Sequence, residues 1–245
     1  ENRHHLIGPK YDWEAYGCED PRITRIGKKY YIFYTALSTY PFNADGIKVG
    51  LAITENFKDV EKHPVTPFNA KAMALFPEKI GGKFAAILTA NTDRPPAKIA
   101  VALFDKESDI WSEEYWRKWY ASLDNHIVPL LRSSADQVEV GAPPIKTKNG
   151  WLLIYAYIKN YRGGWGTIFG TEAVILDIKH PQMVIGRTKG PILVPDRDYE
   201  RNGIVPNIAF PSGALVHKKK LWVYYGAADK LIAAADLASA VGDAV

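Results

Sequence analysis

The sequence predicts an all-β fold of the β-propeller type, and three observations carry that prediction. Four segments rich in aromatic and β-branched residues recur along the chain, each after a Gly or Lys turn, which is the pattern of strands. A short strand precedes each segment and another follows it, so the chain divides into three-strand units. The aromatic segments recur at intervals of 54, 67 and 70 residues, a spacing typical of propeller blades.

The elements follow in a fixed order. The aromatic strands are expected at "KKYYIFYTA" (28–36), "KFAAILTA" (83–90), "GWLLIYAY" (150–157) and "KKLWVYYGA" (219–227). The strands after them are "IKVGLAIT" (47–54), "KIAVALF" (98–104), "EAVILDI" (172–178) and a shorter one from Leu231. "SEEYWRKWY" (112–120) is expected to form a short helix. A β-sandwich is the alternative, but the same order of turn, strand, hairpin and aromatic strand in every unit favours the propeller.

The composition is that of an ordinary globular protein and limits the classes of partner that the protein is expected to bind. The 245 residues are 47% hydrophobic and 24% charged, and the net charge of +4 is scattered, so no nucleic acid partner is expected. No apolar stretch reaches the ~18 residues of a membrane span. Cys18 is the only cysteine, which rules out an internal disulfide and favours a cytoplasmic location. The sequence contains no cofactor motif and no metal-ligand spacing. It does not decide whether the protein forms a homo-oligomer.

The inner strands of a propeller begin around one mouth of its channel, so polar residues at those positions are candidates for a site. These starts read "CEDPR" (18–22), "NAKAMALFP" (69–77), "VEVGAPP" (138–144) and "VPNIAFPSG" (205–213). Charged side chains are costly to bury unless they are paired, so Asp20 is expected to face the channel. The many Tyr and Trp residues are typical of sugar-binding clefts, and Trp165 is a candidate to stack on a sugar.

Six segments in series resemble glycoside hydrolase family 130, which contains β-mannoside phosphorylases and β-1,2-mannosidases. They are "WEAYGCEDPRI" (13–23), "LFPEKIGGK" (75–83), "GAPPIKTKNGWLLIY" (141–155), "VIGRTKGPIL" (184–193), "YERNGIVPNIAFPSGA" (199–214) and "YYGAAD" (224–229). The resemblance implies a five-bladed propeller and an oligosaccharide substrate. Only about four blades are evident, so residues 1–245 are interpreted as a single propeller domain without the family's first blade.

The resemblance also implies roles for individual residues. Asp20 would be the general acid, reaching the glycosidic oxygen through a sugar hydroxyl that relays the proton. The substrate-binding residues that it implies are Arg22, Lys71, Arg94, Glu200 and Asp229. The alternative for Asp20 is a structural role in a turn, paired with Arg22.

The second reactant decides between the family's two reactions. Phosphorylases of this family carry basic residues or a histidine at places where this sequence has Leu37, Glu139 and Ala156. A carboxylate there would repel phosphate and could activate water. The resemblance implies that hydrolases of this family carry a pair of glutamates in this region; Glu139 fits one, and Glu172 is the candidate for the other. The sequence therefore favours an inverting β-mannoside hydrolase. A phosphorylase that releases mannose 1-phosphate and a non-catalytic glycan-binding propeller are the alternatives.

Overall fold

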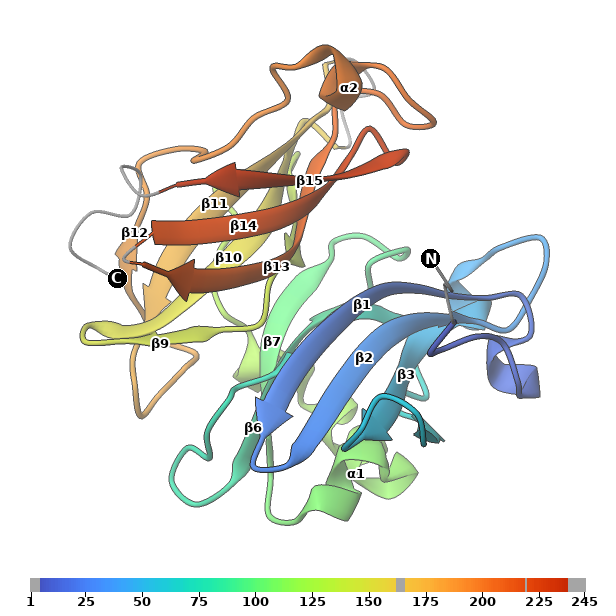
Figure 1. Cartoon of the computed structure of the whole chain (residues 1–245). Helices are drawn as coiled ribbons and strands as arrows, with labels where there is room; N and C mark the ends of the chain where they lie inside the picture. Colours follow the sequence, from blue (N-terminus) through green and yellow to red (C-terminus); the bar gives the residue numbers. More distant parts are fainter. Residues whose placement is uncertain (1–4, 162–165, 219, 238–245) are drawn as a thin grey trace.

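Four antiparallel sheets form the blades of a propeller in this computed structural model (Figure 1). The structure describes residues 5–161, 166–218 and 220–237. The blades follow one another along the chain and are numbered 1 to 4 here. Blade 1 contains β1 (Gly17–Ile26), β2 (Lys29–Leu37), β3 (Ile47–Thr54) and β4 (Glu61–Pro64). Blade 2 contains β5 (Ala70–Leu75), β6 (Phe84–Ala90) and β7 (Lys98–Phe104).

The other two blades repeat the plan, blade 3 with five strands and blade 4 with three. Blade 3 contains β8 (Gln137–Val140), β9 (Ile145–Thr147), β10 (Gly150–Lys159), β11 (Ile168–Leu176) and β12 (Val184–Arg187). Blade 4 contains β13 (Ala209–His217), β14 (Lys220–Ala227) and β15 (Leu231–Asp236). The four aromatic strands are β2, β6, β10 and β14, and each has a neighbour on both sides, which confirms the predicted blade plan. The start of the third inner strand was predicted at β8, whereas the short strands β4 and β12 were not predicted.

Few helical segments interrupt the sheets in the part of the chain described. The predicted helix is present as α1 (Glu113–Ala121), where the Ser112 side chain caps the first turn by accepting a hydrogen bond from the Tyr115 amide. Short turns of 3-10 helix lie at η1 (Asp12–Glu14), η2 (Ala44–Gly46), η3 (Glu107–Trp111) and η4 (Leu123–His126). A four-residue helix, α2 (Asp198–Arg201), precedes blade 4. None of these helices is long and apolar enough to cross a membrane.

The hydrophobic core lies between successive blades. Phe33 and Leu51 of blade 1 pack in one cluster with Leu88 of blade 2 and Trp116 of α1. A second cluster joins blades 2 and 3, and a third joins blades 3 and 4. Burial of such side chains contributes roughly 1.5–3 kcal/mol each, so the interfaces between blades hold the propeller together.

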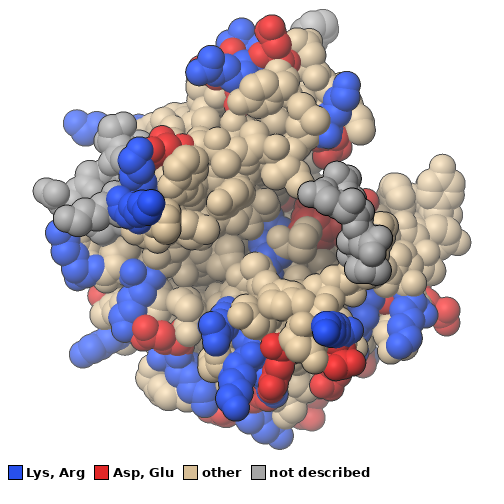
Figure 2. All heavy atoms as spheres, viewed as in Figure 1, with Lys and Arg blue, Asp and Glu red and all other residues tan. Residues whose placement is uncertain are grey.

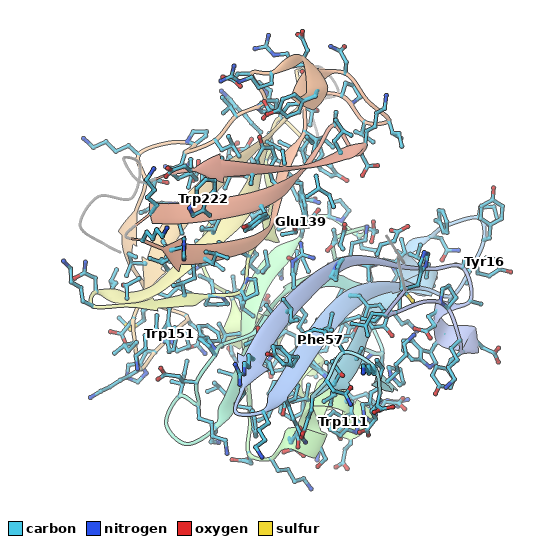
Figure 3. All side chains as sticks on the ribbon, in the orientation of Figure 1. Tyr16, Phe57, Trp111, Glu139, Trp151 and Trp222 are labelled. Atoms are coloured by element: carbon cyan, nitrogen blue, oxygen red, sulfur yellow. The ribbon has the colours of Figure 1, made fainter. Side chains whose placement is uncertain are left out.

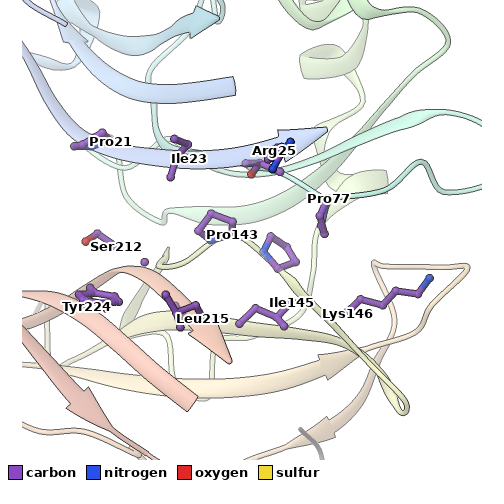
Figure 4. Close-up of a pocket in the computed structure, with 14 residues that line it drawn as sticks. Pro21, Ile23, Arg25, Pro77, Pro143, Ile145, Lys146, Ser212, Leu215 and Tyr224 are labelled. Carbon is purple, nitrogen blue, oxygen red and sulfur yellow. The ribbon is translucent and has the colours of Figure 1, made fainter. Parts of the chain in front are cut away.

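Blades 4 and 1 meet differently. No buried hydrophobic cluster joins them among the described residues; a cavity of about 580 Å³ lies between their inner strands instead. Ile23 of β1 and Leu215 of β13 line opposite sides of this cavity and are 47% and 42% exposed (Figure 4). The ring is therefore less tightly closed here than at its other interfaces.

The inner strands carry an irregularity at a matching level. In β1, β5 and β13 one extra residue is inserted relative to the next strand: between Glu19 and Arg22, between Lys71 and Ala74, and between Pro211 and Gly213. In blade 3 the inner edge is divided into β8 and β9 at the same level. A bulge of this kind turns a side chain away from the regular alternation of a strand.

Candidate functional site

The bulges surround one end of a cavity of about 420 Å³ near the middle of the molecule. Figure 2 shows a hollow between the blades with acidic and basic side chains at its floor. The lining residues are Asp20, Pro21, Lys71, Glu139, Phe169, Val205, Ile208, Phe210, Ser212, Gly226, Asp229 and Ile232. All four blades contribute to this lining, so residues far apart in the sequence share one site.

Asp20 lies on the bulge of β1 and is exposed to the cavity, as the sequence predicts. Its φ angle is 50°, a left-handed conformation that non-glycine residues adopt only when the surroundings impose it. The next residue is Pro21, which has no amide hydrogen and suits a position where the ladder is broken. The bulge thus presents the Asp20 carboxyl group to the cavity.

Glu139 comes from β8, the inner strand of blade 3, and lies between the ribbons of blades 1 and 4 in Figure 3. Burial raises the pKa of its carboxyl group to about 7, against the opposing influence of the Lys71 and Arg22 charges. Gln137 donates a hydrogen bond to Glu139 Oε1 at 3.4 Å. At neutral pH, Glu139 therefore exchanges readily between its acidic and basic forms, as a general acid or base must.

Lys71 is the only cation that lines this cavity within the part of the chain that the structure describes. Its Nζ lies 3.1 Å from Asp93 Oδ1. Burial tends to lower its pKa, but the Asp93, Glu139 and Asp20 charges outweigh burial and raise it. Lys71 is consequently a fixed positive charge beside three acidic side chains.

Asp229 adds a third carboxyl group to the cavity, from the turn after β14. Its φ angle is 53°, so it too is held in a left-handed conformation. Burial raises the pKa of nearby Glu19, and the Asp20 and Asp229 charges raise it further. This mouth of the channel is therefore mainly acidic.

The apolar part of the lining is suited to a sugar ring. Phe169 and Phe210 present aromatic faces, and carboxyl groups beside them can accept hydrogen bonds from hydroxyl groups. Both phenylalanines were missed by the sequence analysis, which looked to Trp and Tyr. The described tryptophans do not line the cavity, and Trp151 and Trp116 are core residues. Trp165 lies outside the described residues.

Arg22 was expected to bind substrate, but the structure buries it below the cavity. Its side chain is 1% exposed, and its nitrogens donate to the backbone carbonyls of Gly141, Asp20 and Val140 at 2.7, 2.8 and 3.1 Å. Burial lowers its pKa, while Asp20 and Glu139 oppose that change. The guanidinium group therefore contacts the protein backbone rather than the cavity.

Glu172 does not reach the cavity, which corrects its assignment as a second base. It lies on β11, is 2% exposed, and accepts hydrogen bonds from Tyr155 Oη at 2.7 Å and from Arg132 Nη2 at 2.8 Å. One oxygen of its carboxylate, Oε2, thus accepts both hydrogen bonds, from β10 and from the loop before β8. Strand periodicity alone did not show which face of the blade Glu172 would occupy.

Two further residues that were expected to bind substrate, Glu200 and Arg94, do not line the cavity either. Glu200 is 1% exposed and accepts hydrogen bonds from Tyr225 Oη and from the backbone amides of Asp196 and Arg197, so it fixes the start of α2. Arg94 is exposed and paired with Asp45, and it does not line the cavity. Of the predicted site residues, the structure brings together Asp20, Glu139, Lys71 and Asp229. The described residues contain no cluster of potential metal ligands.

The fold and this cavity, with its paired carboxyl groups and aromatic faces, define a propeller of the carbohydrate-active class. The family described as beta-1,4-mannooligosaccharide phosphorylase matches residues 1–241. The chain belongs to glycoside hydrolase family 130. Family members are five-bladed propellers, so the fold is an all-β propeller of that type, with four blades among the described residues.

Individual relatives agree with this assignment. A 1,2-beta-oligomannan phosphorylase from Thermoanaerobacter sp. (strain X514) is 34% identical over 240 residues, covering 95% of this chain and 72% of the relative. A beta-1,2-mannobiose phosphorylase of the same organism is 33% identical, covering 91% and 67%. The solved beta-1,2-mannobiose phosphorylase of Listeria innocua, in complex with beta-1,2-mannobiose, has a TM-score of 0.75 and 27% identity. This chain covers 64% of that structure's chain, with 98% of its own residues matched.

Proposed function

We propose that this chain cleaves β-mannosidic bonds by phosphorolysis, releasing mannose 1-phosphate, and that β-1,2-linked manno-oligosaccharides are its substrates. The relatives named above, two of them more than 30% identical to this chain, are a 1,2-beta-oligomannan phosphorylase and two beta-1,2-mannobiose phosphorylases. The observation in the structure that supports cleavage is the meeting of Asp20 and Glu139 in one cavity. This proposal differs from the hydrolase favoured by the sequence alone.

In this proposal Asp20 is the general acid, because it is the carboxyl group of the bulge that lines the cavity. It supplies the proton that the leaving oxygen needs as the glycosidic bond breaks. Phosphate attacks the opposite face of the sugar, and the product has inverted configuration. Phe169, Phe210 and Asp229 form the sugar-binding wall.

Glu139 is compatible with phosphate because its pKa is raised. With its pKa raised to about 7 by burial, the carboxyl group of Glu139 is available in its protonated form at neutral pH. In that form it carries no charge and can donate a hydrogen bond to a phosphate oxygen, while Lys71 supplies a positive charge.

Hydrolysis is the second candidate, and the position of the Glu139 carboxyl group in the cavity favours it. Ionised Glu139 can take a proton from water on the face opposite Asp20, and the cavity holds a single cation, Lys71, among its described lining residues. The two candidates assign opposite protonation states to the same side chain, so one substitution separates them.

The native protein is expected to consume β-1,2-mannobiose at least tenfold faster with phosphate than without it, yielding mannose 1-phosphate. Glu139→Gln should keep much of this phosphorolysis, because glutamine can still donate a hydrogen bond to phosphate. Product chromatography of both proteins, with and without phosphate, measures this. Free mannose formed at an equal rate without phosphate, and lost in Glu139→Gln, would assign hydrolysis instead.

The pH dependence gives an independent prediction. If neutral Glu139 contacts phosphate, the rate falls as pH rises through about 7, because the carboxyl group then ionises beside an anion. The fall should be weaker in Glu139→Gln, which cannot ionise, so the difference between the two profiles separates Glu139 from the titration of phosphate itself. A native rate that rises through this range relative to the variant contradicts phosphorolysis.

A further inference from the structure

Arg22 is a buried, charged side chain, and none of its hydrogen bonds within the described residues goes to a carboxylate. Its three hydrogen bonds all go to backbone carbonyls. Burying a charge is costly, and an ion that contacts only neutral groups recovers less of that cost than a paired one. The nearest acidic side chains that influence it are Asp20 and Glu139, the two carboxyl groups of the cavity. The cost of burying this charge suggests that Arg22 has a role beyond packing.

The carbonyls that Arg22 binds belong to the segments carrying those two carboxyl groups. Nη1 binds the carbonyl of Asp20 itself and so closes the bulge of β1. Nη2 binds the carbonyl of Val140, the residue after Glu139, and Nε binds that of Gly141. One rigid, planar group therefore spans the channel floor from blade 1 to blade 3.

Gly141, whose carbonyl Arg22 binds, is itself tightly packed. A Cβ atom at Gly141 would lie 2.6 Å from the carbonyl oxygen of Ile154 and 2.6 Å from Pro211 Cγ, so only glycine lets blades 3 and 4 approach this closely. The Arg22 guanidinium carbon also lies 5.8 Å from the centre of the Phe210 ring. The fork of Arg22 is thus fixed on several sides, a geometry that the flexible, single-pointed lysine side chain cannot reproduce.

We propose that Arg22 is a positioning residue that sets the separation of Asp20 and Glu139 by holding their backbone segments, and that it provides the positive charge beneath both. This inference rests on the proposed cleavage reaction for its kinetic consequences only. Its structural part, a charge below Glu139, holds whatever reaction the site performs.

The test uses Arg22→Lys and Arg22→Gln, with Arg25→Lys as a matched control. Arg25 lies on the same strand, is exposed, and binds only the nearby Gly27 carbonyl and the Tyr30 ring. Arg22→Lys should lower kcat on β-1,2-mannobiose about 100-fold, since a shift of about 1 Å between reacting groups has that effect. The Kd for the disaccharide should change less than threefold. Arg25→Lys should match the native protein in both.

The second measurement needs no turnover. The Glu139 carboxyl resonance, identified by its loss in Glu139→Gln, is followed through a pH titration by NMR of protein labelled with ¹³C at glutamate carboxyl groups. Its midpoint should rise in Arg22→Gln, because the positive charge below it is gone, and stay close to native in Arg22→Lys and Arg25→Lys. An inactive native protein with this pattern would refute the proposed reaction and leave the Arg22 inference standing.

Three results would overturn the inference. One is native kcat in Arg22→Lys, and another is an unmoved Glu139 midpoint in Arg22→Gln. The third is a large loss of sugar affinity at unchanged kcat, which would make Arg22 a sugar contact as first expected. If Arg22→Lys fails to fold while Arg25→Lys folds, Arg22 serves folding rather than positioning, and the inference is equally wrong.

Discussion

Asp20→Asn is expected to lower turnover of β-1,2-mannobiose by ~100-fold or more while leaving its binding within about threefold of native. Asparagine keeps the shape of the side chain and its ability to bind sugar hydroxyl groups, but it has no proton to give to the leaving oxygen. The left-handed conformation at position 20 also suits asparagine, so the bulge should persist. Steady-state kinetics and calorimetric titration with the disaccharide measure the two quantities.

Asp105→Asn provides the control for this experiment. Asp105 is exposed and paired only with Lys83 at the surface, so the same chemical change there should leave both quantities as they are. A near-native rate in Asp20→Asn would move the general acid to another residue.

Lys62→Met is expected to have the largest effect on stability. Lys62 forms an ion pair with Glu14, and the two side chains are 6% and 0% exposed. Glu14 also accepts hydrogen bonds from Tyr34 Oη at 2.6 Å and from the Lys10 amide at 3.1 Å, which joins the N-terminal segment to blade 1. Removing one member of a buried pair leaves the other charge uncompensated, so the free energy of unfolding should fall by about 3–5 kcal/mol. Denaturant-induced unfolding, followed by tryptophan fluorescence, measures it.

The double variant Glu14→Gln/Lys62→Met is the control, because it removes both charges and should recover part of the loss. The native pair also predicts a pH dependence. Burial tends to raise the pKa of Glu14, but the Lys62 and Tyr34 hydrogen bonds outweigh it and lower the pKa. The stability that this shift contributes is present at neutral pH and is lost as the pH falls below the ordinary range of a glutamate. A fall of less than about 1 kcal/mol in Lys62→Met would mean that the pair contributes little.

The sequence predicted the blades well because each has an aromatic middle strand whose pattern depends on local residues. It missed β4 and β12, which have only four residues each and lack that pattern. It also missed the bulges, because an inserted residue such as Ala72, with a φ angle of 52°, has no distinctive sequence around it.

The candidate site was predicted only in part, for a physical reason. Asp20, Glu139, Lys71 and Asp229 lie at strand starts or turns, where topology alone brings them to one mouth. Glu172, Glu200 and Arg22 are charged residues whose partners come from tertiary contacts, such as Arg132 for Glu172 and Tyr225 for Glu200. A sequence shows that a residue is charged, but it does not show whether a partner has already neutralised or bound it.

The irregular inner strands have a consequence for how this fold can change over time. Because each blade departs from regular pairing at the same level, the side chains there are released from the alternation that packs one blade against the next. Asp20, Lys71 and Ser212 can therefore be exchanged for other residues without altering the hydrophobic contacts between blades. The propeller offers one replaceable position in each of these three blades, so a new acceptor or sugar preference can arise by substitution at the rim while the stability of the propeller is retained.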